Sequence, residues 1–127
     1  MRKNHRTSIG LAILCLASAA LFAGCKFSDD IKALVIGDVK VAELRDGVYL
    51  GEQDNKPVTA KVEVSVAGGR ITAIKVLAHG HGPKHGADAI VDRVIAAQGL
   101  KVDSVSGASY SSKVMLKAIE LALDKGL

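Results

Sequence analysis

Five serines lie within the ten residues from Asp103 to Ser112, directly before a strongly patterned helix. The first N–H groups of an α-helix have no partner inside the helix and carry the positive end of its dipole, so they stabilise an anion. Gly107 adopts a positive φ angle without steric cost, and Ser111 or Ser112 is suited to cap the helix. The stretch therefore predicts a phosphate-binding site, although a well-capped helix after a turn explains the same residues.

The order of the residues in this stretch resembles the motif of the small FMN-binding domain family. That family includes flavinylated subunits of membrane redox complexes and short secreted or lipid-anchored proteins. The motif runs here as Asp103-x-x-Ser106-Gly107-Ala108-Ser109-Tyr110-Ser111-Ser112. The resemblance extends from about Asp46 to the C-terminus and includes Asp46-Gly47-Val48-Tyr49-x-Gly51.

In that family a hydroxyl residue after Gly-Ala is joined to FMN by a phosphoester bond, which a separate flavin transferase makes from FAD. The resemblance gives this position to Ser109, where the family usually has Thr, and non-covalent FMN is the alternative. It also implies a loop that the transferase recognises and an environment for the phosphate. The loop residues are Asp103, Ser106, Gly107 and Ala108, and the phosphate environment is Ser111, Ser112 and Lys113.

Three of the four histidines, His79, His81 and His85, lie within seven residues of a glycine-rich loop. Histidine is the commonest metal ligand, so the loop is a weak candidate for a zinc or copper site, with Asp88 as the nearest carboxylate. A loop with no ligand, stiffened by Pro83, is the simpler interpretation. The family resemblance suggests a third one, in which His79, His81 and Lys84 donate hydrogen bonds to the flavin.

The first 24 residues have the pattern of a signal peptide, with basic residues before an apolar run from Ile9 to Phe22. The run is too short and alanine-rich for a permanent membrane span. It ends in Leu21-Phe22-Ala23-Gly24-Cys25, which resembles a bacterial lipoprotein cleavage box with Cys25 as the lipidated residue. We therefore expect a protein of the cell envelope, anchored by Cys25 to the outer face of the cytoplasmic membrane or in the periplasm. An ordinary signal peptide is the alternative.

Composition favours one small globular domain, since 24% of the 127 residues are charged and 49% are hydrophobic. The formal charge is +4, but three of the positive charges lie in the signal peptide. Without them 14 basic residues face 13 acidic ones, a net charge of +1 that argues against nucleic acid as a partner. Loss of Cys15 with the signal leaves Cys25 without a disulfide partner.

Apolar alternation predicts strands over Val48–Glu52, Val58–Val66 and Ile71–Leu77, the last two joined by a glycine hairpin. Helical spacing predicts helices over Asp88–Gln98, ended by Gly99, and over Ser111–Lys125. The expected fold is α+β, a small antiparallel sheet of three or four strands covered by two helices. Gly51 indicates a bulge or the close approach of another group, such as a flavin ring.

The sequence divides into a signal peptide (1–24), a tether or lead-in (25–45) and an FMN-binding domain (46–127). The first part of the lead-in is either a short helix capped by Ser28 or a flexible tether. Its last part, Val39–Leu44, suits a strand or an extended segment. The last helix carries a polar stripe whose lysines precede its acids, an order that opposes the helix dipole. Its residues are Lys113, Lys117, Glu120 and Asp124.

We expect a lipid-anchored, FMN-carrying domain that relays electrons between redox partners that the sequence does not identify. Its other partners are the membrane and a flavin transferase. The first rival is a metal-binding lipoprotein that uses His79, His81 and His85. The second is a cofactor-free scaffold module with the same fold, because a fold does not determine a function.

Overall fold

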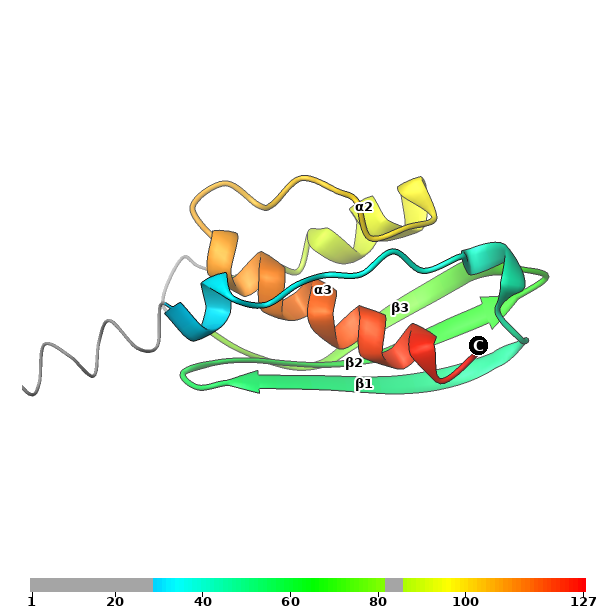
Figure 1. Cartoon of the computed structure of the whole chain (residues 1–127), viewed down its shortest axis with the longest axis horizontal. Helices are drawn as coiled ribbons and strands as arrows, with labels where there is room; N and C mark the ends of the chain where they lie inside the picture. Colours follow the sequence, from blue (N-terminus) through cyan, green and yellow to red (C-terminus); the bar gives the residue numbers. More distant parts are fainter. Residues whose placement is uncertain (1–28, 82–85) are drawn as a thin grey trace, which may run out of the picture.

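The computed structural model describes residues 29–81 and 86–127. Three strands, β1 (Gly47–Asn55), β2 (Val58–Ala67) and β3 (Arg70–Gly80), form an antiparallel sheet in the order β1-β2-β3. The helices α2 (Ile90–Ala97) and α3 (Ser109–Asp124) lie on one face of this sheet (Figure 1). The predicted α+β architecture is thus confirmed, with three strands and two covering helices.

The strands follow the predicted alternation but are longer at the edges of the sheet. The inward side chains of β2 are all buried, and β1 pairs with β2 in one unbroken register from Gly47 to Asn55. Both edge strands exceed their predicted bounds, because β2 offers ten consecutive residues for pairing. The turn between β2 and β3 has Gly68 and Gly69 at φ angles of 60° and 71°, as the glycine pair predicts.

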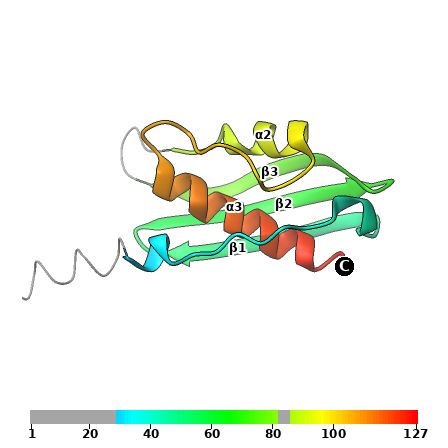
Figure 2. The same cartoon turned by 45° about the horizontal axis from the view of Figure 1, so that its top comes forward.

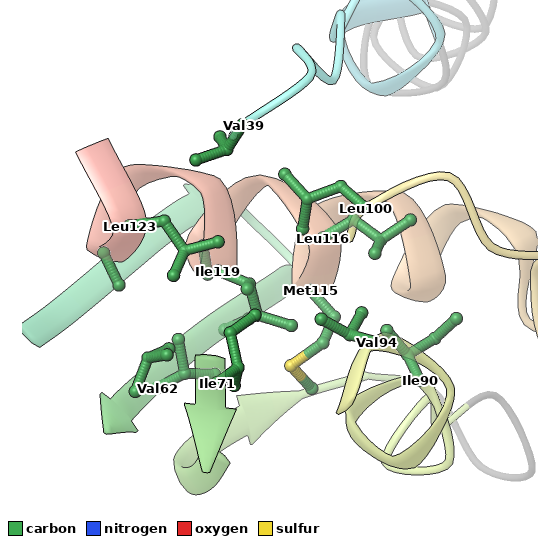
Figure 3. Packing of buried hydrophobic residues seen from close by; sticks show 14 of the residues in the cluster. Val39, Val62, Ile71, Ile90, Val94, Leu100, Met115, Leu116, Ile119 and Leu123 are labelled. Atoms are coloured by element: carbon green, nitrogen blue, oxygen red, sulfur yellow. The ribbon is translucent and has the colours of Figure 1, made fainter. Parts of the chain in front are cut away.

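The core lies between the sheet and α3. Figure 3 shows Met115, Ile119 and Leu123 of α3 in the same cluster as Val62 of β2 and Ile71 of β3. All five side chains are at most 2% exposed. Burial of this apolar surface is the main term that holds the helix on the sheet.

Gly51 explains how closely α3 approaches the sheet. A Cβ atom at this position would lie 1.9 Å from the Ala118 carbonyl oxygen and 2.7 Å from the Ala122 nitrogen. The group that the strand glycine accommodates is therefore the backbone of α3. The predicted bulge is absent from the pairing of β1 with β2, which is regular throughout.

The helix α2 ends at a glutamine, and not at Gly99 as predicted. Gln98 is the left-handed residue, with φ 50°, and its amide joins the helix to the edge strand β3. Its Oε1 accepts a hydrogen bond from the Ile71 nitrogen at 2.7 Å, and its Nε2 donates to the Ile71 oxygen at 2.9 Å. The Gln98 amide thus pairs with the main chain of the edge strand as a further strand would. These two bonds offset the cost of the left-handed conformation.

Residues 29–44, hereafter the N-terminal segment, pack along α3 (Figure 2). They comprise a helical turn at 29–32, an extended stretch and the 3₁₀ helix η1 (Val41–Glu43). The part expected as a strand or extended lead-in, Val39–Leu44, thus contains a 3₁₀ turn. Ile31, Val39 and Leu44 are buried, so this segment contributes side chains to the core. The predicted cap Ser28 lies outside the described residues.

The polar stripe of α3 faces the N-terminal segment. Lys117 Nζ donates to the Val35 oxygen at 3.1 Å and pairs with Glu120 Oε2 at 3.2 Å, and Glu120 is only 9% exposed. A Cβ atom at Gly37 would lie 2.9 Å from Glu120 Oε1. The stripe is therefore largely a contact between elements, although Asp124 remains exposed.

Candidate functional site

The stretch before α3 forms a tight turn. The Ala108 nitrogen donates to the Val105 oxygen at 3.0 Å, and Gly107 in the third position of the turn has φ 76°. A turn of this kind requires a positive φ at the third residue, which glycine adopts without strain. The predicted conformational role of Gly107 is confirmed. Among the described residues, no heavy atom lies within 4 Å of a Cβ atom built at Gly107.

The helix begins two residues earlier than predicted. Its first residue is Ser109 and its N-cap is Ala108, so Ser111 and Ser112 lie inside the first turn and do not cap the helix. The methyl side chain of Ala108 has no acceptor for the first N–H groups, and the first turn contains no acidic residue. The dipole at this helix start therefore favours an anion such as a phosphate, with no acidic side chain of the first turn to oppose it.

Ser112 connects the turn to the helix from within. Its hydroxyl accepts a hydrogen bond from the Val105 nitrogen at 2.9 Å and donates to the Ala108 oxygen at 2.7 Å. The side chain of Ser112 is completely buried, so its bond to the Ala108 oxygen is shielded from water. Ser112 therefore holds the turn in place and with it the position of Ser109.

Arg93 of α2 holds the other end of the loop. Its Nη1 donates to the carbonyl oxygens of Asp103 and Ser104, at 2.7 Å and 2.9 Å. Sequence reasoning missed this residue. Arg93 carries no motif, and it faces the loop only because α2 and α3 lie side by side on the sheet (Figure 1).

The predicted site residues divide into an exposed and a buried group. The side chains of Asp103, Ser106 and Ser109 are exposed, whereas Ala108, Ser111 and Ser112 are buried. The predicted phosphate neighbour Lys113 is directed elsewhere, since its Nζ donates to the Lys32 oxygen at 2.7 Å. The structure thus brings together an accessible hydroxyl at Ser109 and a helix start that favours an anion.

The two described histidines of the glycine-rich loop lie at the end of β3, with ring centroids 4.6 Å apart. His79 uses both ring nitrogens on the main chain: Nδ1 lies 2.8 Å from the Thr59 oxygen, and Nε2 accepts from the Ala87 nitrogen at 3.1 Å. While these bonds hold, neither nitrogen of His79 is available to a metal or a flavin. Lys84 and His85 lie outside the described residues, and the described ones contain no group of three or more His, Cys, Asp or Glu that could hold a metal ion.

The FMN-binding domain family matches residues 55–124, more than half of the chain. The chain belongs to the FMN-binding domain family. The matched region begins at the end of β1 and includes the Gly107 turn and all of α3. The predicted family is therefore confirmed over this range, and membership implies FMN as the ligand.

A relative of this FMN-binding domain is an uncharacterized protein of Treponema pallidum (strain Nichols), 28% identical over 87 residues. The alignment covers 66% of the present chain and 24% of the relative. The chain thus spans about a quarter of the length of this curated relative.

The residues at the start of α3 fit the phosphate of FMN. The dipole of α3 favours an anion at this helix start, and the Gly107 turn lies directly before it. Ser109 adds an exposed hydroxyl at the first helical position.

Among the described parts of the chain, no helix is long and apolar enough to cross a membrane.

Proposed function

We propose that this FMN-binding domain carries FMN on Ser109 Oγ through a phosphoester bond and acts in electron transfer. The observation that supports this most directly is the position of Ser109. Its side chain is exposed at the first residue of α3, immediately after a turn held by Ser112, in a loop whose other end is held by Arg93. A hydroxyl at that place reaches a phosphate that the helix start also stabilises.

The attachment step balances with FAD as the donor and a flavin transferase as the catalyst. Ser109 Oγ forms a bond to the phosphorus of the FMN half, and the phosphoanhydride bond of FAD breaks. AMP leaves, and the serine proton passes to solvent through the transferase. When bound, FMN supplies the redox chemistry, while the protein supplies orientation and electrostatics.

Ser104, in the same loop, provides a matched control for Ser109. We expect the parent chain, co-expressed with a flavin transferase, to gain the mass of FMN less one water, and Ser109→Ala to gain nothing. Ser104→Ala changes an exposed serine of the same loop outside the motif, so it should gain the same mass as the parent. Equal gain by Ser109→Ala and the parent, measured by intact mass, contradicts the attachment site.

The cellular part of the proposal is a lipid anchor on Cys25 that holds the domain outside the cytoplasmic membrane. Its support is the cleavage-box sequence alone, because Cys25 lies outside the described residues. We expect the parent chain in the membrane fraction of a bacterial host and Cys25→Ala in the soluble envelope fraction. Both chains in the soluble fraction would contradict the anchor.

A further inference from the structure

The N-terminal segment enters the fold beside the start of α3. Lys113 Nζ, one helical turn after Ser109, donates to the Lys32 oxygen at 2.7 Å. Figures 1 and 2 both show the blue turn of residues 29–32 next to the orange start of α3. The chain therefore leaves the described structure at the same end of the molecule as Ser109.

This point of entry is firmly attached to the domain. Ile31 is completely buried in the core. The turn around it is closed by hydrogen bonds from the Ala33 nitrogen to the Asp29 oxygen, 2.9 Å, and from the Leu34 nitrogen to the Ile31 oxygen, 3.1 Å. A tether on the N-terminal side is therefore joined to the folded domain at Asp29.

The length of such a tether is bounded by the sequence. Cys25 and Asp29 are four residues apart, so even a fully extended chain between them spans at most about 14 Å. The 16 residues of α3 span about 24 Å, which sets the scale of the domain along the helix. The tether is thus shorter than the domain, and the end where it attaches stays nearer to the anchor.

The β2–β3 turn marks the opposite end. The Gly68 nitrogen donates to Asp46 Oδ1 at 2.9 Å, and the adjacent Arg45 nitrogen donates to the Gly126 oxygen at 3.0 Å, just beyond the end of α3. Ala67, the last residue of β2, is exposed at this end. Ser109 and Ala67 therefore report on the two ends of the domain.

We propose that a lipid anchor on Cys25 holds the Ser109 end of the domain at the membrane surface and the Ala67 end farther from it. The inference rests on the anchor in the proposed function, but not on the attachment of FMN. Its consequence is that a partner reaching Ser109 acts at the membrane surface. The short tether and the buried Ile31 carry the inference together.

The test measures energy transfer from a dye on the protein to an acceptor on lipid headgroups. The full chain with Ser109→Cys or Ala67→Cys is made in a lipoprotein-processing bacterial host without a flavin transferase, and intact mass verifies acylation. Acylation consumes the thiol of Cys25, so the introduced cysteine takes the dye. In phosphatidylcholine vesicles we expect higher transfer efficiency for Ser109→Cys than for Ala67→Cys.

A longer tether provides the matched control. A Gly/Ser linker of about 20 residues between Ser28 and Asp29 adds roughly 25 Å of average reach, so we expect loss of most of the difference. The same linker placed after Leu127 should leave the difference intact. Equal or reversed efficiencies in the membrane-bound parent overturn the inference and leave the attachment of FMN, measured by mass, untouched. A chain that is not acylated overturns the inference together with the anchor.

Discussion

The second half of α3 and its first turn are held in place by different interactions. The second half is held by apolar contact so close that β1 has a glycine where Ala118 and Ala122 approach it. The first turn is held by hydrogen bonds of a buried serine and by the neighbouring loop, and it leaves Ser109 exposed. One helix thus combines a tightly packed part with an accessible part.

The difference teaches which substitutions should affect stability and which should affect chemistry. Close packing does not tolerate added atoms, because the interior has few voids into which neighbours can move. An exposed hydroxyl at a helix start contributes little to stability, so it can bind a ligand with little effect on the free energy of unfolding. The predictions below separate these two kinds of position.

The largest loss of stability is expected for Gly51→Ala. The new Cβ atom would overlap the Ala118 carbonyl oxygen, so α3 must move away from β1, and we expect a loss of about 3 kcal/mol. Urea unfolding measures this change. Gly99→Ala is the matched control and should change stability little, because among the described residues its Cβ atom would meet only the Ala97 oxygen, at 3.9 Å. Equal stability of the two variants would refute the close-packing account.

A smaller loss is expected for Lys117→Met on the face of α3 that contacts the N-terminal segment. The change leaves Glu120, whose side chain is 11% exposed, without its cation. We expect about 2 kcal/mol, below the ~3–5 kcal/mol of fully buried pairs, because Lys117 is 23% exposed. Lys40→Met breaks the exposed pair with Glu43 at the same sequence spacing and should cost less than about 0.5 kcal/mol. Similar urea midpoints for both variants would count against a buried contact.

Ser112→Ala tests the junction between the turn and the helix. It leaves the half-buried Val105 N–H without its acceptor, so we expect a loss of about 1–2 kcal/mol and slower attachment of FMN. Ser111→Ala is the control for stability, since this serine is also buried but, within the described residues, makes no hydrogen bond to the loop. Thermal unfolding and a time course of intact mass measure the two effects. The proposed role of Ser112 fails if both serine variants take up FMN at the parent's rate.

The smallest change in stability is expected for Ser109→Ala, at the exposed start of the helix. We expect a difference within about 0.5 kcal/mol in urea unfolding, together with the complete loss of attached FMN. A large loss of stability would mean that Ser109 is a structural residue. The contrast with Gly51 would then disappear.

Much of the fold follows from local patterns. The alternation in β2 predicts a strand with one buried face, and the pair Gly68-Gly69 predicts the hairpin, because both depend on short-range geometry. The motif around Ser109 also identifies the family without a structure, and Gly107 adopts the expected positive φ. These features concern residues that are neighbours in sequence.

The rest depends on contacts between distant segments. The sequence favours serine as the cap of α3, but the turn and Ser112 make Ala108 the N-cap. Gln98 replaces Gly99 as the left-handed residue, because its side chain pairs with Ile71, 27 residues away. Local propensity gives way where a long-range hydrogen bond offsets its cost.

The sequence alone therefore determined the strands, the apolar faces of the helices and the family motif around Ser109, since these depend on residue type and spacing. Only the tertiary structure decided that Gly51 accommodates α3, that Arg93 holds the loop, and that the N-terminal segment covers the polar stripe. Each of these relations joins residues that are far apart in the chain. No local sequence pattern predicts such a contact, because it forms only when the elements pack together.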